Sequence, residues 1–366
     1  MIRLAFVIPT LDQSGAERQL TLLATSLPPA EYTIRVFALN RGGHYQQPLE
    51  NAGIPTTVLG KHFRFDVRTA LRLRSQLRSF QPHIVQSFLF SANTLVRLPG
   101  IVPPGTKVIV SERCVDSWKT PWQLFVDRRL ARRASALVGN SHSVTDFYRN
   151  LGVPADTLHC IPNVAPPPAT PLDRTAARET LGLPPDAPVI GFVGRLAPQK
   201  RLRDLVWAFQ LLQQVQSHAH LVIIGDGPAA AALKSLAQTF DSRPRITFTG
   251  HRSDAAALLS AFDVFVLPSE FEGMSNSLME AMQHSLPCVV SDIPANLELI
   301  RPDENGLSFP LGNAPALAKT LLRLLNDPPL RRQLGTAAQH RISTDCSPAV
   351  IQTAWCRLYS QLLVRP

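Results

Sequence analysis

The chain alternates short apolar runs with longer stretches in which apolar residues recur every three or four positions. Apolar runs of about four to eight residues are typical of strands buried on both faces, and the wider spacing is typical of amphipathic helices. Their alternation predicts an α/β fold with parallel sheets and crossover helices. The predicted strands are residues 3–8, 33–39, 55–59, 83–88, 107–111, 136–139 and 158–161, then 189–193, 220–224, 245–249, 263–267, 288–291 and 307–309.

A proline-rich segment divides this pattern in two. It holds Pro162, Pro166, Pro167, Pro168 and Pro171, and such a segment continues neither a helix nor a central strand. We therefore predict two Rossmann-like, doubly wound parallel-sheet domains, residues 1–165 and 166–345, and a closing helix within 346–366 that packs back toward the first domain. Ligands bind at the carboxyl ends of strands in such sheets, so a cleft between the domains is expected to hold them.

Composition narrows the class of protein. The chain has 366 residues, of which 45% are apolar and 17% charged, as in ordinary globular proteins. No apolar run approaches the roughly 18 residues of a membrane-spanning helix, and the run from Ile2 to Ile8 is too short for a signal peptide. The five cysteines are scattered without a C-x-x-C pair, which favours a reducing compartment over disulfides or a zinc site. We expect a cytoplasmic protein.

The formal net charge of +10 suggests a partner that carries phosphate. A basic surface attracts the phosphates of nucleic acids, lipid headgroups or nucleotides alike. No helix-turn-helix pattern, zinc-finger spacing or aromatic RNA-stacking motif accompanies the charge. Nucleic acid is therefore not expected as a partner.

The segment from Pro268 to Met282, PSEFEGMSNSLMEAM, follows a predicted strand directly. Its Gly, Ser and Asn residues precede a helical run, which is the pattern of a helix N-terminus. The free amides of such a terminus suit a pyrophosphate. Glu272 lies in the loop and Glu280 in the helix, where a carboxylate can accept hydrogen bonds from sugar hydroxyls. The structural alternative is that the serines cap the helix and Glu280 interacts with its dipole.

Two cations follow an earlier strand of the second half. The run GFVGRLAPQK, residues 191–200, leaves a strand and enters a helix, so Arg195 and Lys200 should lie at the carboxyl end of the sheet. A departing diphosphate must be neutralised by a metal or by protein cations. Arg binds phosphate bidentately and Lys adds a point charge. Two ordinary surface cations are the alternative. No clear Asp-x-Asp pair demands a metal, so neither metal nor cofactor is expected.

These segments resemble the retaining glycosyltransferases of family 4, which have the GT-B fold. Glu272 and Glu280 stand at the two glutamates of the family's E-x7-E motif, and Arg195 and Lys200 match its Gly-Arg-Leu…Lys segment. The resemblance implies that Arg195, Lys200 and Glu272 are catalytic: the cations neutralise the diphosphate, and Glu272 contacts donor-sugar hydroxyls near the reacting carbon. It implies that Glu280 holds the ribose of the donor. The main-chain amides implied to meet the diphosphate and sugar are those of Gly273, Met274, Ser275 and Asn276.

One departure from the family pattern concerns the end of the same helix. The family commonly has Gly there, where this chain has His284-Ser285. A left-handed Ser costs roughly 1 kcal/mol relative to Gly. The helix end is therefore expected to differ from that of relatives, while the chemistry is not.

Three further residues are donor-binding candidates by the same resemblance. Gly15, in Ser14-Gly15-Ala16-Glu17-Arg18, matches part of a turn that faces the diphosphate, although Ser14 and Glu17 also fit a simple capping box. Arg113 ends a later strand where many relatives have a histidine. Arg252, after the strand at 245–249, borders the nucleotide base in one interpretation and lies in a solvated loop in the other.

A basic amphipathic stretch lies within residues 63–78, where arginines at 64, 68, 72, 74 and 78 alternate with apolar residues. The simpler interpretation is a crossover helix with a solvated arginine face. The alternative is a patch for anionic lipid, as in helices that lie on a membrane surface. The hypothesis that follows is peripheral association with the inner face of the cytoplasmic membrane.

The sequence thus predicts a retaining glycosyltransferase that moves a hexose or N-acetylhexosamine from a nucleoside-diphosphate sugar to a glycan or lipid-linked acceptor. The expected setting is polysaccharide or glycolipid biosynthesis. Two alternatives stay open: another GT-B enzyme, such as an inverting transferase or a sugar-nucleotide epimerase, and a non-catalytic protein that binds nucleotide sugars. The donor nucleotide, the sugar and the acceptor are not specified by these motifs.

Overall fold

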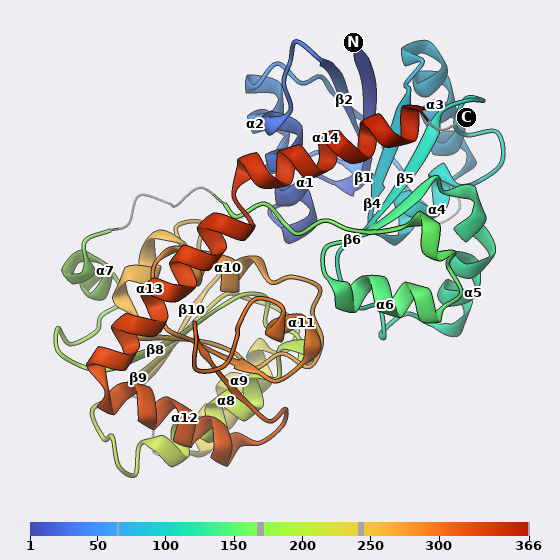
Figure 1. The fold of residues 1–366 in the computed structure, drawn as a ribbon. Helices are drawn as coiled ribbons and strands as arrows, with labels where there is room; N and C mark the ends of the chain where they lie inside the picture. The colour runs from blue at the N-terminus through green and yellow to red at the C-terminus, as the bar shows by residue number, and fades with distance from the viewer. Residues whose placement is uncertain (64–65, 167–171, 241–244, 365–366) are drawn as a thin grey trace. The chain divides into compact units, whose positions relative to one another are not determined.

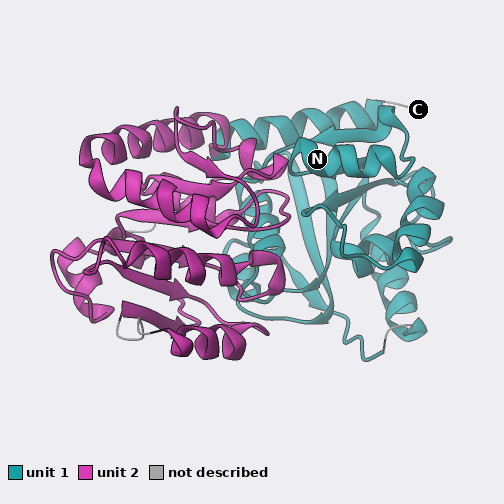
Figure 2. Ribbon diagram, turned by 90° about the horizontal axis from the view of Figure 1, so that it is seen from below, with its two compact units in different colours: residues 1–164, 348–366 teal, residues 165–347 magenta. Residues whose placement is uncertain are grey.

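The structure is a computed structural model that describes residues 1–63, 66–166, 172–240 and 245–364. The chain forms two compact units (Figure 2): unit 1 comprises residues 1–164 and 348–366, and unit 2 comprises residues 165–347. Of the predicted proline-rich linker, Pro167, Pro168 and Pro171 lie outside the described residues. Each unit has its own sheet and core, and each is described by itself.

Unit 1 is built on a parallel sheet with the strand order β3-β2-β1-β4-β5-β6-β7 (Figure 1). Its strands are β1 (Ile2–Thr10), β2 (Tyr32–Arg41), β3 (Thr56–Val58), β4 (Ile84–Phe88), β5 (Lys107–Glu112), β6 (Ala136–Gly139) and β7 (Leu158–Cys160). Its helices are α1 (Gly15–Ser26), α2 (Gln46–Asn51), α3 (Val67–Phe80), α4 (Leu89–Val96), α5 (Pro121–Leu130), α6 (His142–Asn150) and α14 (Pro348–Val364), with short 3-10 turns η1 (Ala131–Arg133) and η2 (Ala155–Thr157).

Both faces of this sheet are covered, which explains why its strands are continuous apolar runs. In β1, Phe6 and Ile8 pack in one cluster with residues of α1 and α14. The intervening Val7 packs on the other face in a cluster with residues of α3 and α4. The last helix, α14, therefore closes the core of unit 1 although unit 2 lies before it in the sequence.

Unit 2 has a second parallel sheet, with the order β10-β9-β8-β11-β12-β13. Its strands are β8 (Val189–Val193), β9 (His220–Ile224), β10 (Ile246–Gly250), β11 (Val264–Leu267), β12 (Cys288–Ser291) and β13 (Leu307–Phe309). Its helices are α7 (Arg174–Thr180), α8 (Leu202–Leu212), α9 (Ala230–Thr239), α10 (Asn276–Gln283), α11 (Pro294–Leu297), α12 (Ala314–Asn326) and α13 (Pro328–Asp345), with 3-10 turns η3 (Pro198–Lys200) and η5 (Ala257–Ala261).

The observed strands confirm the predicted ones, with ends that differ by one or two residues. The two Rossmann-like sheets are also as predicted. In each sheet the chain first builds strands to one side and then crosses to the other, which creates a topological switch point. It lies between β1 and β4 in unit 1 and between β8 and β11 in unit 2. Ligands of open α/β sheets bind outside the carboxyl ends of the strands at such points.

Candidate functional site

The switch point of unit 2 brings two predicted site loops together. Arg195 and Lys200 lie in the loop between β8 and α8, and Glu272 lies in the loop between β11 and α10. The β8 and β11 strands are hydrogen-bonded neighbours, so both loops leave the same edge of the sheet. Lys200 Nζ forms an ion pair with Glu272 Oε1, and both side chains are largely buried. The sequence predicted both residues for one site but not their pairing.

Gln199 joins the same two loops. Its side-chain Nε2 donates to the carbonyl oxygen of Phe271 at 2.6 Å, and its own carbonyl accepts from the amide of Glu270 at 2.9 Å. The two bonds join the main chain next to Lys200 to the main chain next to Glu272. The positions of this cation and carboxylate are thus set by main-chain contacts and not by the ion pair alone.

The loop that carries Arg195 rests on the turn after β9. The amide of Leu196 donates to Asp226 O at 2.9 Å, and the amide of Ala229 donates to Leu196 O at 2.8 Å. A Cβ atom on Gly225 would lie 1.9 Å from the carbonyl oxygen of Gly194, so only glycine fits there. The Gly225-Asp226-Gly227-Pro228 turn therefore supports the cation loop. The Arg195 side chain itself is exposed.

Buried polar groups at the end of β12 hold the loop before α10. Ser291 Oγ donates to the carbonyl oxygen of Ser269 at 2.5 Å, and Asn296 Nδ2 donates to Ser291 Oγ at 3.0 Å. Ser275 is the N-cap of α10, and its hydroxyl accepts from the amide of Leu278 at 3.4 Å. The predicted helix start is therefore correct, and the α10 amides open at the carboxyl end of β11.

The remaining residues of this segment differ in exposure. Glu280 is half-buried in α10, one turn beyond Asn276. The Met274 side chain is buried in the core of unit 2, so a ligand contact from this residue would come from its main chain. Ser285, just beyond the helix, has a φ of 55°, which is the left-handed conformation considered for this position from the sequence.

Arg252 follows β10, two strands from β8 in the sheet. Its guanidinium makes a bidentate ion pair with Asp254, with N–O distances of 2.8 and 2.6 Å. The pairing lowers the pKa of Asp254. Arg252 lies at the carboxyl end of the sheet, where a nucleotide contact is expected. In this structure its guanidinium is already paired with the Asp254 carboxylate.

In unit 1, Gly15 is the first residue of α1, the helix that follows β1. β1 is one of the two strands at the switch point of this sheet. The predicted capping box is wrong: Ser14 is the N-cap, but its side chain makes no capping hydrogen bond. Its hydroxyl instead donates to Glu17 Oε2 at 2.5 Å, and Thr10 donates to Glu17 Oε1 at 2.9 Å. Because two hydroxyls occupy the carboxylate, Glu17 ties α1 to the end of β1.

Arg113 follows β5 and contacts Phe88 at the end of β4 and Asn163 beyond the end of β7. Its Nη1 donates to Asn163 Oδ1 at 3.0 Å, and its guanidinium lies over the Phe88 ring, 5.1 Å from the centroid. Burial lowers the pKa of Arg113 to about 10, which still leaves the side chain charged at neutral pH. Its Nε is buried without a hydrogen-bond partner among the described residues.

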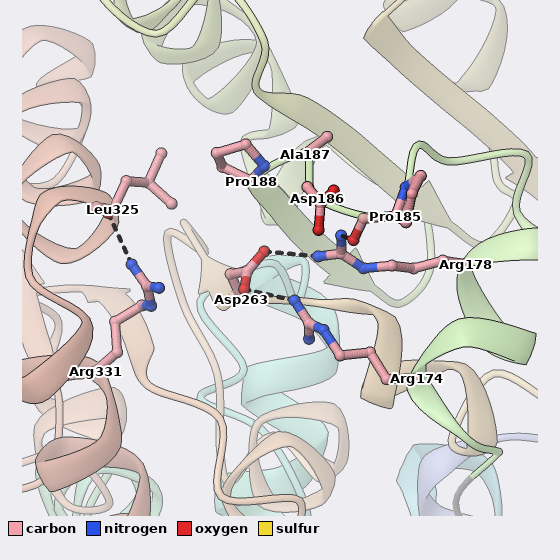
Figure 3. A pocket seen from close by; sticks show the side chains of 9 residues that line it. All are labelled: Arg174, Arg178, Pro185, Asp186, Ala187, Pro188, Asp263, Leu325 and Arg331. Carbon is pink, nitrogen blue, oxygen red and sulfur yellow. Dashed lines mark hydrogen bonds and ion pairs between the residues drawn. The ribbon is translucent and has the colours of Figure 1, made fainter.

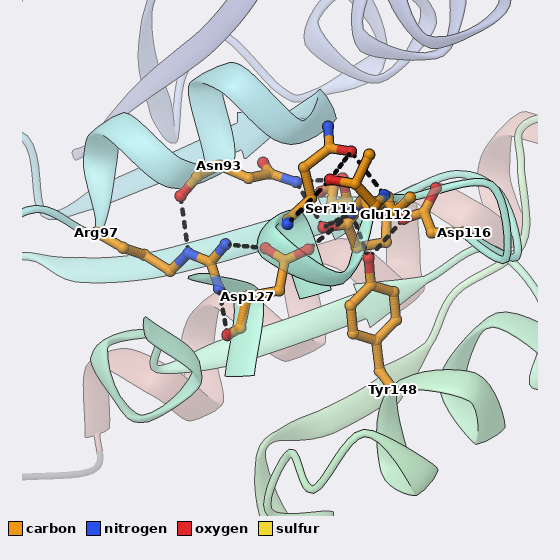
Figure 4. A network of polar contacts seen from close by, with 10 residues as sticks. Asn93, Arg97, Ser111, Glu112, Asp116, Asp127 and Tyr148 are labelled. Carbon is orange, nitrogen blue, oxygen red and sulfur yellow. Dashed lines mark hydrogen bonds and ion pairs between the residues drawn. The ribbon is translucent and has the colours of Figure 1, made fainter. Parts of the chain in front are cut away.

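A buried charge network lies beside Arg113 (Figure 4). Asp127 on α5 binds Arg97, the C-cap of α4, at 2.6 Å and Lys119 at 2.8 Å, and Lys119 also binds Asp116 at 2.7 Å. Tyr148 on α6 donates to Asp116 Oδ2 at 2.5 Å, and Glu112 accepts from Asn93 Nδ2 at 2.9 Å. These side chains are almost fully buried. The network fixes the loop between β5 and α5 to three surrounding elements.

The network holds three carboxylates but two cations. Burial, together with the neighbouring Asp116 and Asp127 carboxylates, raises the pKa of Glu112 to about 7 against the attraction of Lys119. With Glu112 protonated, Arg97 and Lys119 balance the two aspartates. Glu112 is 3% exposed and contacts the network through Asn93.

A pocket lined by Arg174, Arg178, Asp186, Asp263 and Arg331, with Pro185, Ala187, Pro188 and Leu325, lies elsewhere on unit 2 (Figure 3). Asp263 binds Arg174 at 2.7 Å and Arg178 at 3.0 Å and accepts from the Val189 amide at 2.8 Å. Val189 begins β8 and Asp263 precedes β11, so this pocket lies at the amino ends of the strands. It is therefore opposite the Lys200–Glu272 pair.

No group of three or more His, Cys, Asp or Glu side chains in the described residues is arranged to hold a metal ion. No helix in the same residues is long and apolar enough to cross a membrane.

Sequence reasoning missed Gln199, Ser291 and the buried network of unit 1. Gln199 was visible only as a residue inside the cation motif, with no local signal for its bond to the next loop. The network partners lie far apart in the sequence, from Asn93 to Tyr148, and meet because α4 packs beside α5 and Tyr148 of α6 contacts Lys119 and Asp116.

Comparison with known proteins identifies two family matches that together cover most of the chain. Residues 173–341 match the family described as "Glycosyl transferases group 1", and residues 13–167 match "Glycosyltransferase Family 4". The first match contains the Lys200–Glu272 pair, and the second contains Gly15 and Arg113.

Individual relatives agree with the family matches. The chain is 29% identical over 225 residues to the alpha-D-kanosaminyltransferase of Streptomyces kanamyceticus, an alignment that spans 60% of this chain and 58% of that relative. It is 27% identical over 354 residues to the lipopolysaccharide core biosynthesis glycosyltransferase LpsD of Rhizobium meliloti, with 95% and 96% covered. The solved structure of Anabaena HepE in complex with UDP-glucose has a TM-score of 0.86 at 19% identity and covers 99% of this chain and 100% of its own.

Proposed function

We propose that this chain, which belongs to the glycosyltransferases of group 1 and family 4, transfers a hexose or N-acetylhexosamine from a nucleoside-diphosphate sugar to a glycan or lipid-linked acceptor. The observation that carries the proposal is the Lys200–Glu272 pair at the switch point of unit 2, with Arg195 in the same loop as Lys200. The names of the relatives support it: they are sugar transferases, and one neighbouring structure holds UDP-glucose.

In the proposed complex the diphosphate of the donor lies against Arg195, Lys200 and the amides of residues 273–276. Arginine and lysine supply the positive charge, and the opening turn of α10 supplies N–H donors. Glu280 accepts hydrogen bonds from the ribose, and Glu272 accepts them from the donor sugar. The Lys200–Glu272 pair places a phosphate-binding cation beside a sugar-binding carboxylate. This order matches the donor, in which the sugar is bonded directly to the diphosphate.

Arg113, Gly15 and Arg252 are the outer contacts of the donor in this proposal. The partly buried Arg113 is charged and has an unpartnered Nε, so it can meet an anionic or hydroxyl group of the ligand. Gly15 allows close approach of the α1 main chain. To contact the nucleotide base, Arg252 must first break its ion pair with Asp254.

The proposed reaction retains the configuration of the donor sugar. The bond between the anomeric carbon and the diphosphate oxygen breaks, and the acceptor hydroxyl forms a new bond on the same face. The proton of that hydroxyl passes to the departing phosphate oxygen, whose charge Arg195 and Lys200 stabilise. We propose that no metal is needed, because these two cations neutralise the leaving group.

Replacement of the paired residues tests this function. We expect Lys200→Ala and Glu272→Ala each to abolish sugar transfer, because the developing charge loses its cation or the sugar loses its orienting carboxylate. Transfer is measured as release of nucleoside diphosphate from a panel of donors, selected by their effect on the melting temperature. Circular dichroism checks that the variants are folded.

Matched controls use residues of the same type on the surface of unit 2. Lys234→Ala and Glu304→Ala should keep full transfer, since both side chains are exposed and outside the site. Near-normal turnover in both site variants would refute the assignment. An inverted product anomer would identify an inverting transferase, an epimerised donor would identify an epimerase, and donor binding without turnover would identify a binding protein. Loss of activity with a chelator would contradict the metal-free proposal.

A lipid-linked acceptor would require the protein to reach a membrane surface, and α3 offers one candidate contact. Leu73 and Leu77 pack in the core, while Val67 and Leu71 are exposed together with Arg68, Arg72 and Arg78. Arg64 and Phe65 lie outside the described residues. We propose that this face binds anionic lipid. Sedimentation with anionic vesicles at low and high salt tests it, and an absence of salt-sensitive binding would reject it.

A further inference from the structure

Three exposed aromatic side chains gather around the start of α5 in unit 1. Trp118 and Trp122 are each 55% exposed and Phe125 is 67% exposed, although such side chains are usually buried. Trp122 and Phe125 are one helical turn apart, and Trp118 lies just before the N-cap Thr120. Exposed aromatic groups on a rigid element are a common sign of an interaction surface.

The same helix face continues into an arginine cluster. Arg128 and Arg129 are exposed in the last turn of α5, and Arg132 and Arg133 are exposed in η1. Arg128 and Arg129 lie three and four residues after Phe125, and Arg132 and Arg133 lie three and four residues after Arg129, so the cluster follows one side of α5 and its extension into η1. We call these seven residues the α5 surface: Trp118, Trp122, Phe125, Arg128, Arg129, Arg132 and Arg133.

The exposed charge of the α5 surface is entirely positive. Asp116 and Asp127 are the carboxylates of this segment, and both are buried in the network of Figure 4 with Lys119 and Arg97. The four arginines therefore have no exposed carboxylate on α5 or η1 to neutralise them. Aromatic side chains beside uncompensated arginines complement an interface of acyl chains and anionic headgroups.

The buried network gives this surface a fixed shape. Lys119 lies between Trp118 and the N-cap of α5, and it is held by Asp116 at 2.7 Å and Asp127 at 2.8 Å. The capping box of Thr120 and Gln123 closes the first turn. Because the inward side chains are fixed, the main chain that carries Trp118 and Trp122 has little conformational freedom to lose on binding.

We propose that the α5 surface docks on an anionic lipid bilayer, with the tryptophans at the headgroup level and the arginines on the lipid phosphates. The inference rests on the membrane-linked acceptor proposed above and assigns the main contact to α5, with the α3 face as a second and weaker contact. Both helices belong to unit 1, and α5 contacts α4, whose neighbour in the sequence on the same sheet face is α3.

Vesicle binding of the full chain tests the proposal. Sedimentation with vesicles of phosphatidylglycerol and phosphatidylcholine is compared with phosphatidylcholine alone. We expect Arg132→Glu with Arg133→Glu to lower the ratio of bound to free protein by roughly tenfold or more. The control carries the same charge change on exposed arginines of unit 2, Arg203→Glu with Arg332→Glu, and should bind like the wild type.

Tryptophan fluorescence gives the second readout. Anionic vesicles should shift the emission of the wild type to shorter wavelength, and Trp118→Ser with Trp122→Ser should remove the shift. Trp207→Phe is the control, because Trp207 is 45% exposed but lies on α8 in unit 2. Wild-type vesicle binding by either α5 variant would overturn the proposal. So would a concentration-dependent dimer that the Trp118→Ser, Trp122→Ser variant abolishes, since the surface would then bind a second copy.

Two comparisons separate this inference from the other proposals. Reversal of Arg68 and Arg78 on α3 should weaken vesicle binding less than reversal on α5; loss of binding with the α3 variant alone would assign the contact to α3. The melting-temperature shift caused by UDP is measured in every variant and should be unchanged. A chain that docks through α5 but shows no UDP shift would contradict the proposed donor and leave the docking surface standing.

Discussion

At the scale of single residues, ion pairs fix the charged side chains of the candidate site and of the buried network. Lys200 and Glu272 are paired across two loops at the candidate site, where a ligand can compete for either charge. In unit 1 the paired charges are buried, and the excess carboxylate is Glu112. A buried ionised group is costly unless it is fully compensated, so the protonation of Glu112 affects stability.

We expect Glu112→Gln to stabilise the protein at alkaline pH. The pKa of Glu112 is raised to about 7 in the folded chain, so between its ordinary value of 4.5 and about 7 the folded state binds a proton that the unfolded state has released. Stability therefore falls as pH rises through this window. Glutamine keeps the acceptor for Asn93 and removes the charge, so unfolding at about pH 8 should require about 1–3 kcal/mol more than in the wild type.

Melting temperatures measured across the pH range test this expectation. The difference between Glu112→Gln and wild type should vanish toward about pH 4, where the carboxyl group is protonated in both states. Glu31→Gln, at an exposed position of the same unit, serves as the control. A constant difference at all pH values would show that the effect arises from packing and not from titration.

At the scale of elements, the candidate site is a set of loops that support one another. The turn after β9 carries the loop of Arg195, and Gln199 joins that loop to the one before α10. Such contacts fix reacting groups in position, and small displacements of those groups reduce turnover strongly.

Gly225→Ala should displace the Arg195 loop. Gly225 has a φ of 139°, and its added Cβ would lie 1.9 Å from the carbonyl oxygen of Gly194. We expect sugar transfer to fall by roughly tenfold to hundredfold in the turnover number, because the loop must move away from the diphosphate. Gly182→Ala is the matched control: its φ is 65°, but an added Cβ meets nothing within 4 Å. If both variants lose stability alike and transfer normally, the supporting role is wrong.

The sequence predicts the elements themselves better than the contacts between them. The strands were predictable because a strand buried on both faces is a continuous apolar run, as in residues 221–224 of β9. The start of α10 followed from Ser275. The capping box at Ser14 failed because Thr10, in the preceding strand, donates to the same carboxylate. The Gln199 bond and the buried network depend on which loops become neighbours, and local patterns do not specify that order.

At the scale of the whole molecule, unit 1 is assembled from two distant parts of the chain. The inner face of α14 packs Trp355 and Tyr359 into the core of the first sheet. Tyr359 also donates to Gln86 Oε1 at 2.5 Å, and Gln86 Nε2 donates to Ser111 Oγ at 2.9 Å. The hydroxyl thus connects α14 to β4 and β5 through fully buried groups.

Tyr359→Phe should destabilise unit 1 by about 1–2 kcal/mol, because the carbonyl of Gln86 loses its donor in a buried position. Chemical denaturation followed by circular dichroism measures the change in unfolding free energy. Tyr45→Phe is the comparison, since Tyr45 is only half-buried, and it should change stability less. An unaltered midpoint for Tyr359→Phe would mean that water replaces the lost donor.

The division of unit 1 between residues 1–164 and 348–366 also sets an order on the ribosome. When residue 164 emerges, only α1 packs on the side of the first sheet that holds Phe6, and the part that α14 covers is open because α14 has still to be translated. Unit 2 is continuous and can fold as soon as its own residues are out. The nascent chain therefore carries an open apolar face throughout synthesis of its second half, and this is the interval in which a chaperone would matter most.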